Sequence, residues 1–195
     1  MDIQTYLHRI HFQGLVQSDF DTLRGLHIAH MRAVPFENLD IALKRPIHID
    51  EASLWDKIVV NKRGGFCYEL NGLFELLLNK IGFDLDYLNG RVFNKEGKRG
   101  IEFDHLALLV KIPDSSTRWL ADVGFGDSFI EPLNFEERGE QARGLRAYRL
   151  EEISDGFVAW QKNYDGAWER QYFFDVTPRT FPQDYEAGCL YHQTS

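Results

Sequence analysis

Three side chains in this sequence are of the types that carry out nucleophilic catalysis, and the cysteine has the clearest setting. The segment KRGGFCYELNGLF, residues 62–74, places Cys67 directly after a glycine turn and at the start of an apolar run of helical period. A helix N-terminus presents unpaired N–H groups and the positive end of the dipole, which favours a thiolate. We therefore expect Cys67 to be an exposed nucleophile, whereas Cys189 has no such setting and is expected to be an ordinary buried thiol.

A nucleophilic cysteine needs a base and a group that orients that base. His105 begins the expected strand DHLALLVKI, and Asp122 ends the expected strand RWLAD. Neighbouring antiparallel strands bring the start of one and the end of the other to the same end of a sheet, so the sequence favours a Cys67, His105 and Asp122 triad. A lone histidine on a strand is also compatible with a half-buried structural role. Three other acidic residues remain alternatives for the orienting group: Glu102, Asp104 and Asp127.

Two histidine pairs are spaced as metal ligands can be. His8 and His11, and likewise His27 and His30, lie one helical turn apart and could present two imidazoles on a common face. Neither pair has an obvious third ligand nearby in the sequence, so we predict no metal site.

The segment DVGFGDS, residues 122–128, contains two glycines after a strand. Gly124 and Gly126 would let backbone N–H groups approach a phosphate or carbonyl oxygen closely, and they are equally ordinary in a tight turn. Neither a P-loop lysine pattern nor a dinucleotide fingerprint is present.

The elements that must position these residues fall into two halves. Helical periodicity predicts helices over 3–10 with an Asp2 cap, from Ser18 to just before Pro35, from Asp50 through residue 58, and over 67–81 with Gly82 as terminator. From residue 83 onward, short apolar or alternating segments separated by turns predict an antiparallel sheet or barrel. We expect an α+β protein with a helical domain over 1–82 and a β-barrel domain over 83–182.

Composition excludes several classes of protein. The chain has 195 residues, a net charge of −8 and two cysteines, which predicts a globular protein with reduced thiols and no nucleic-acid partner. It lacks a signal-peptide pattern and any apolar run near the ~20 residues of a membrane span, so we expect a cytoplasmic protein without a membrane partner. A polyanionic ligand would have to be met by local basic residues such as Lys62, Arg63, Lys98 and Arg99.

Four motifs together resemble the arylamine N-acetyltransferase family across almost the whole chain: AVPFENLDI, RGGFCYELNGLF with Cys67, FDHLALLV with His105, and ADVGFGD with Asp122. The resemblance implies a papain-like Cys-His-Asp arrangement, split between a helical domain and a β-barrel domain. It further implies ping-pong acetyl transfer from acetyl-CoA to an arylamine, hydrazine or N-hydroxyarylamine in xenobiotic metabolism. In this reading Cys67 is acetylated, His105 transfers protons, Asp122 holds the imidazole, Phe125 lines the arylamine pocket, and Gly124 and Gly126 border the coenzyme.

The sequence departs from the family pattern in its length. Family members typically continue into a third, α/β domain, whereas residues 183–195 here correspond to the start of the segment that leads to it. We therefore expect impaired arylamine transfer, with acetyl-CoA hydrolysis as the main residual activity. Two alternatives stay open: a papain-like or transglutaminase-like cysteine hydrolase, and a binding module that retains only the fold.

Overall fold

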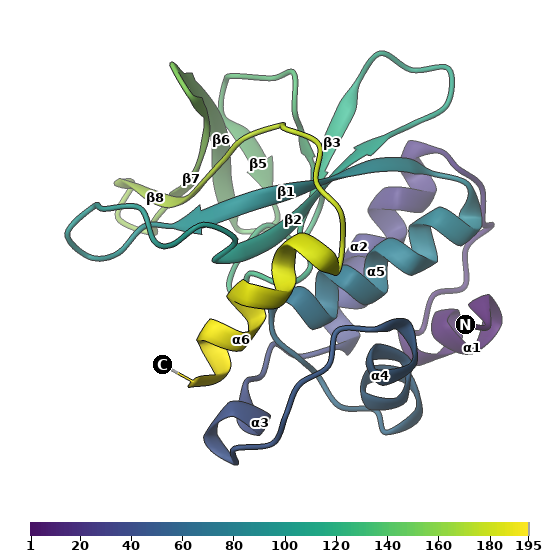
Figure 1. The fold of residues 1–195 in the computed structure, drawn as a ribbon. Coiled ribbons are helices and arrows are strands. Elements are labelled where there is room, and N and C mark those ends of the chain that lie inside the picture. Colours follow the sequence, from purple (N-terminus) through teal and green to yellow (C-terminus); the bar gives the residue numbers. More distant parts are fainter. Residues whose placement is uncertain (195) are drawn as a thin grey trace.

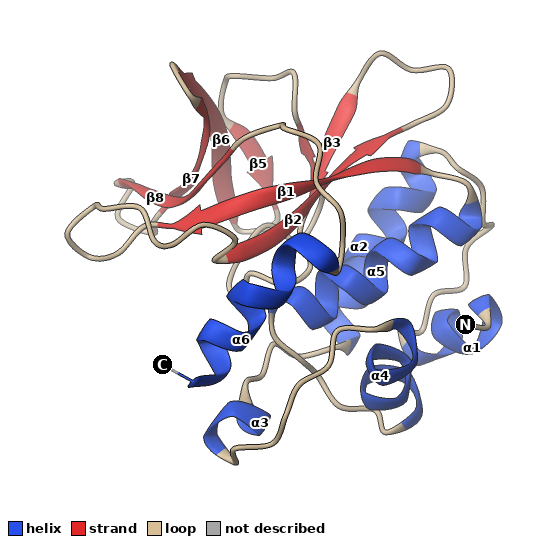
Figure 2. Cartoon of the chain, viewed as in Figure 1, coloured by secondary structure: helices blue, strands red, loops and turns tan. Residues whose placement is uncertain are grey.

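Helices fill the first 81 residues, and strands follow them. The computed structural model describes residues 1–194, and Figures 1 and 2 show the helices gathered below one side of a curved sheet. The helical segments are α1 (Ile3–Arg9), α2 (Phe20–Ala33), α3 (Leu39–Ala42), α4 (Glu51–Trp55), the π-helical turn η1 (Asp56–Val60), α5 (Cys67–Ile81), the 3₁₀ turn η2 (Gln183–Tyr185) and α6 (Glu186–Thr194).

Local capping explains where several helices begin and end. Asp2 and Asp50 each accept a hydrogen bond from the backbone N–H three residues on, at 2.7 and 3.1 Å, as the sequence predicts. Gly82 ends α5 in the left-handed region at a φ of 107°. The expected start of the second helix at Ser18 is wrong, because Asp19 is the cap and accepts from the N–H three residues on at 2.8 Å. A carboxylate also complements the positive end of the helix dipole, which a serine hydroxyl does not.

Eight strands form one antiparallel sheet that curves into a nearly closed barrel, so the predicted α+β fold is confirmed. They are β1 (Asp84–Val92), β2 (His105–Lys111), β3 (Arg118–Ala121), β4 (Leu133–Asn134), β5 (Gln141–Arg143), β6 (Arg146–Ile153), β7 (Gly156–Lys162) and β8 (Trp168–Phe174), in the order β4-β3-β2-β1-β8-β7-β6-β5. The edge strands β4 and β5 are linked by the Gln141 side chain, which accepts from the Asn134 N–H at 2.8 Å and donates to its carbonyl at 2.9 Å. A side-chain amide thus replaces the backbone ladder that would close the barrel.

Strand β2 lies between two hydrophobic cores. Leu106, Leu108 and Val110 pack into the core beneath the helices, and Ala107 and Leu109 point into the barrel. Burial on both faces explains why this strand reads as a continuous apolar run without alternation. Because α5 packs on β2, the helix that carries the cysteine and the strand that begins with the histidine are fixed against each other.

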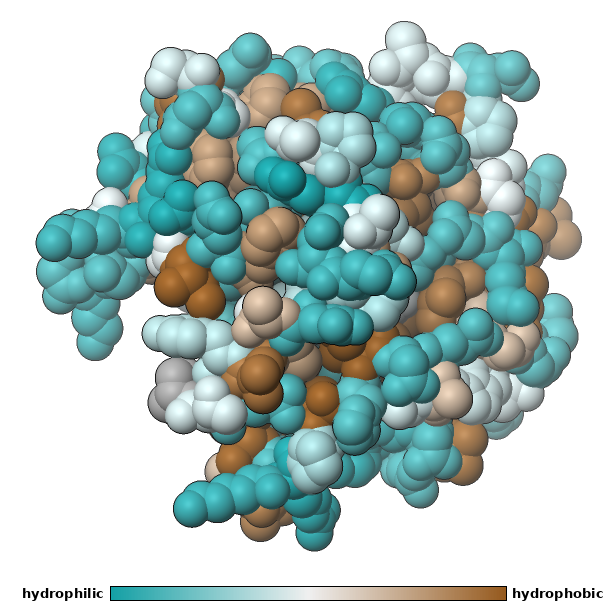
Figure 3. Space-filling model, in the orientation of Figure 1, coloured by the Kyte–Doolittle hydropathy of each residue, from teal (hydrophilic) through white to brown (hydrophobic). Residues whose placement is uncertain are grey.

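Helix α6 lies beside the N-terminal part of α5 and near α3 (Figure 1). Figure 3 shows this face as mostly hydrophilic, with small separate apolar patches. Among residues 1–194, no helix is long and apolar enough to cross a membrane.

Candidate active site

Cys67 is the first residue of α5 and lines a cavity of about 350 Å³. The turn before it is held by a bridge between Phe36 and Gly65, and a side chain at Gly64 would run into the carbonyl of Pro35. The two glycines therefore serve close packing as well as turn formation. Cys67 is only 7% exposed, so the thiol is reached through the cavity and not from the open surface, as a fully exposed nucleophile would be.

His105 and Asp122 meet Cys67 at the end of the sheet where β2 begins and β3 ends. The Nε2 atom of His105 lies 2.7 Å from Oδ2 of Asp122, and Cys67 is a second hydrogen-bond partner of the same ring. Both members of the pair are fully or almost fully buried, at 2% and 0% exposure. The structure thus brings together the three residues that the sequence singles out.

The electrostatics of this pair favour charge on both partners. Burial alone lowers the pKa of His105, but the charge and hydrogen bond of Asp122, followed by Cys67, outweigh it and raise this pKa to about 10. Burial raises the pKa of Asp122, while the His105 charge and the bonds from His105, Asn71 and Gly124 hold it below its usual value. An imidazolium beside a thiol stabilises the thiolate that attacks a carbonyl carbon.

The three alternative acids have other surroundings. Asp104 accepts from the N–H of Val92 at 3.1 Å and lies 3.0 Å from the Nε2 atom of His192. Asp127 pairs with Arg146 at 2.7 Å, and Glu102 is exposed. Among the acids that the sequence left open, Asp122 is therefore the one whose carboxylate contacts His105.

Asn71 supports the site and was not identified from the sequence. Its Nδ2 donates to Oδ1 of Asp122 at 2.8 Å and to the carbonyl of Leu106 at 2.6 Å, while its Oδ1 accepts from the N–H of Val123 at 2.9 Å. One fully buried side chain thus connects α5 with β2 and with the segment after β3. The signal in the sequence is slight: a lone polar residue one turn after Cys67 on an otherwise apolar helix face.

The His27 and His30 pair does not form a metal site. His27 donates from Nδ1 to the carbonyl of Ile130 at 2.9 Å, and its Nε2 accepts from the N–H of Asp122 at 3.1 Å. His30 Nδ1 lies 2.7 Å from the hydroxyl of Tyr6. Burial lowers the pKa of both rings, to about 4 and about 3, so both are neutral core side chains. Within the described residues, no group of three or more histidines, cysteines or acids is arranged to hold a metal ion.

The walls of the cavity are largely aromatic. The ring of Phe125 lies 5.0 Å from that of His105 in an edge-on arrangement, and Phe36 forms the opposite wall with 47% exposure. Gly124 also lines the cavity, and a Cβ atom there would lie 2.8 Å from the Cα of Cys67, so only glycine allows this close approach. Gly126 adopts a φ of 80° and is not among the lining residues. His192 of α6 does line the cavity, a position to which the sequence gave no function.

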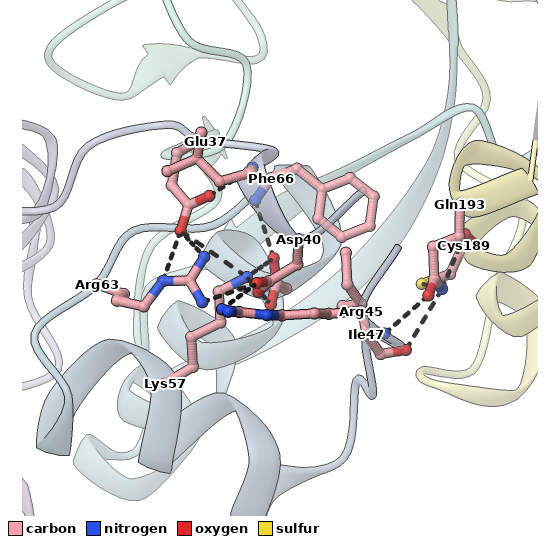
Figure 4. Close-up of polar contacts among 11 residues, drawn as sticks. Glu37, Asp40, Arg45, Ile47, Lys57, Arg63, Phe66, Cys189 and Gln193 are labelled. Carbon is pink, nitrogen blue, oxygen red and sulfur yellow. Dashed lines mark hydrogen bonds and ion pairs between the residues drawn. The ribbon is translucent and has the colours of Figure 1, made fainter. Parts of the chain in front are cut away.

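An ion cluster fixes the start of α5 (Figure 4). Glu69 accepts from the N–H of Phe66 at 3.2 Å and is paired with the Nζ atom of Lys57 at 2.7 Å. Lys57 also reaches Asp40 at 2.8 Å, and Asp40 pairs with Arg63 at the same distance. Because Arg63 is committed to this cluster, it is not free to meet a polyanion as the sequence suggests.

The other basic residues named for a polyanion differ from one another in their surroundings. Arg99 pairs with Asp155 at 2.6 Å and stacks on the ring of Phe173 at 3.7 Å from its centre, so it is engaged as well. Lys62 and Lys98 are exposed.

Comparison with known proteins gives one consistent relationship. Residues 19–195 match the family model described as N-acetyltransferase. The chain is 38% identical over 175 residues to the arylamine N-acetyltransferase / N-hydroxyarylamine O-acetyltransferase of Salmonella typhimurium, covering 89% of this chain and 61% of that enzyme. The structure of the Mycobacterium marinum arylamine N-acetyltransferase superposes with a TM-score of 0.93 at 34% identity, over 99% of this chain and 72% of that one. Its complex with CoA gives the same TM-score at 33% identity, over 100% and 72% of the two chains.

Proposed function

The chain belongs to the arylamine N-acetyltransferase family, and we propose that it transfers an acetyl group from acetyl-CoA to an arylamine, hydrazine or N-hydroxyarylamine through a thioester on Cys67. The observation that carries the proposal is the contact of His105 with both Asp122 and Cys67 at the floor of an aromatic cavity. Because the chain spans 61% of the length of the Salmonella relative, the activity and substrates of a whole protein remain part of the proposal.

The first half-reaction forms the thioester. The Cys67 thiolate attacks the carbonyl carbon of acetyl-CoA, the bond between that carbon and the coenzyme sulfur breaks, and coenzyme A leaves after taking a proton from His105. Asp122 stabilises the imidazolium before this step and keeps the ring in position afterwards. The positive end of α5 favours the negative charge that the thiolate carries into the reaction.

The second half-reaction consumes the thioester. The amine nitrogen attacks the acetyl carbon, His105 accepts the N–H proton, and the Cys67 sulfur leaves as a thiolate. Phe125 and Phe36 would flank an aromatic acceptor, because both line the cavity that contains Cys67. At about 350 Å³, this cavity suits the acetyl group and a small aromatic amine, so the nucleotide end of the coenzyme would lie outside it. We keep Gly124 and Gly126 as the proposed border of the coenzyme site.

For the 195-residue polypeptide, we propose that acetyl-CoA hydrolysis outpaces transfer to arylamines. Phe36, one aromatic wall of the cavity, is 47% exposed, so water reaches the acetyl-cysteine and an acceptor ring is held on few sides. Poor positioning lowers the advantage of a bound amine over water. Two unpaired, buried cysteines suit a reducing compartment, and we propose the cytoplasm as the location.

The test is to follow release of free coenzyme A from acetyl-CoA with and without aniline, while acetanilide is measured directly. We expect slow release without aniline, little acetanilide, and loss of both in Cys67→Ala. Glu102→Gln, at an exposed acid, serves as the matched control and should behave as the wild type. Rapid acetanilide formation would contradict the hydrolysis proposal, and release that persists in Cys67→Ala would contradict the thioester mechanism.

A further inference from the structure

A second cavity of about 370 Å³ shares no lining residue with the cavity of Cys67. It lies between α2, the segment after β3 and the turn that joins β5 to β6. Three arginines reach it, Arg32 from α2 and Arg143 and Arg146 from the two sides of the turn. We call it the arginine cavity.

The turn holds two of these arginines directly opposite each other. Arg143 and Arg146 are paired residues of antiparallel strands, so their side chains leave the same face of the sheet. Gly144, with a φ of 68°, allows the two-residue turn that keeps them together. Like charges at directly opposed positions are destabilising, and an anion between them relieves the repulsion.

The acids nearby leave part of this positive charge uncompensated. Glu131 is bound in a two-pronged pair by Arg24, at 2.6 and 3.0 Å. Asp127 pairs with Arg146 at 2.7 Å. Within residues 1–194, no carboxylate lies within 4.0 Å of Arg32 or Arg143, so two guanidinium groups lack an ionic partner.

Arg143 is partly buried and is held in place by neutral acceptors. Its guanidinium donates to the carbonyls of Pro132 and Ala142, at 3.1 and 2.8 Å, and to Oε1 of Gln141 at 3.2 Å. Burial lowers the pKa of Arg143, which reflects the cost of removing its charge from water without a counter-ion. The planar guanidinium is therefore oriented in advance, and its remaining N–H groups can bind a carboxylate.

Apolar and aromatic side chains complete the lining. Tyr148 and Ile130 are buried or half-buried at the wall, whereas Leu145 and Tyr164 stand 92% and 79% exposed. The ring of Tyr164 lies 4.8 Å from the guanidinium carbon of Arg146. A ligand that combines an oxyanion with a flat ring would satisfy the arginines and cover these side chains at the same time.

We propose that the arginine cavity is a binding site for a small aromatic carboxylate, separate from the site at Cys67. The carboxylate would lie between Arg32 and Arg143, and the ring would pack on Tyr148, Tyr164 and Leu145. The proposal concerns a different cavity and does not depend on acetyl transfer, so it can fail or succeed independently of the proposed function.

The experiment is to titrate the 195-residue chain into 4-fluorobenzoate and follow the line width of its ¹⁹F NMR signal. The neutral isostere 4-fluorobenzamide is titrated in parallel. We expect saturable broadening for the carboxylate and none for the amide. Absence of broadening for the carboxylate, or equal affinity for the amide, would overturn the proposal.

Substitutions locate the ligand. Arg143→Gln and Arg32→Gln should each weaken 4-fluorobenzoate by about tenfold, the effect of losing one hydrogen bond to a charged group. Arg32 makes no polar contact within the described residues, so its variant should fold even if loss of the Arg143 bonds disturbs the turn. Arg138→Gln, on the same barrel outside the cavity, is the matched control and should bind as the wild type does. Unchanged binding in Arg32→Gln would place the ligand elsewhere and overturn the proposal.

Discussion

Replacing Asp122 with Asn removes the negative charge beside His105 and preserves the size of the side chain. In the wild type, this carboxylate lies 2.7 Å from the ring and is the main reason why the pKa of His105 rises to about 10 despite burial. His27 shows what burial does without such a partner: its ring bonds only to backbone groups, and its pKa is lowered to about 4. We expect His105 in Asp122→Asn to be neutral at pH 7.

The structure gives the size of this change. The difference between a pKa of about 10 and the ordinary value of 6.5, at 1.36 kcal/mol per pH unit, corresponds to about 5 kcal/mol of stabilisation of the imidazolium. Loss of the imidazolium removes the partner cation of the Cys67 thiolate and the proton donor for the leaving group. We expect acetylation of Cys67 at pH 7 to fall by about 10²- to 10⁴-fold, the usual contribution of a positioned acid or base.

Two assays follow this variant. The ring nitrogen shifts of His105, measured by ¹⁵N NMR from pH 5 to 9, report its charge directly, and the rate of Cys67 alkylation by iodoacetamide at pH 7 reports the thiolate. Glu102→Gln, which removes an exposed acid that the sequence also offered, should match the wild type in both. If folded Asp122→Asn keeps an imidazolium at pH 7, or alkylates at the wild-type rate, the assigned role of Asp122 is wrong.

Three further predictions follow from the same coordinates. Iodoacetamide should modify Cys67 much faster than Cys189, because burial protects Cys189 and raises its pKa to about 12; equal rates in peptide mass spectra would contradict this. Gly124→Ala should cost about 1–3 kcal/mol in urea unfolding, because the new methyl group would lie 2.8 Å from the Cα of Cys67; an unchanged midpoint would show that the loop can move away. His27 and His30, with pKa values lowered to about 4 and about 3, bind fewer protons folded than unfolded below pH 6.5. Their contribution to stability is therefore present above pH 6.5 and lost as the pH falls toward 4, and a flat urea midpoint over this range would refute it.

The parts of the fold that local signals specify could be read from the sequence. The helix over 67–81 has an unbroken apolar face and a terminating Gly82, and the structure gives it the same bounds. Strand β2 and the end of β3 were placed correctly for a similar reason: each is an apolar run bounded by turn residues. Family motifs then made the Cys67, His105 and Asp122 grouping specific, which spacing alone did not.

Other features depend on partners far along the chain. The two-residue strand β4 and three-residue strand β5 are too short for periodicity to reveal, and they are joined by a side-chain amide. Asn71 binds residues 35 and 51 positions away, so no local pattern identifies its role. Helix α6 was not assigned from the sequence, and the place of His192 at the cavity follows from its packing against α5 and from its pair with Asp104.

The most direct test of the proposed function is the intact mass of the chain after brief incubation with acetyl-CoA and acid quenching. We predict a gain of one acetyl group, located by peptide mapping on Cys67 and absent from Cys67→Ala, because only this thiol lines the cavity beside His105. A chain that gains no acetyl group at any time point, or that gains it equally in Cys67→Ala, would contradict the thioester mechanism.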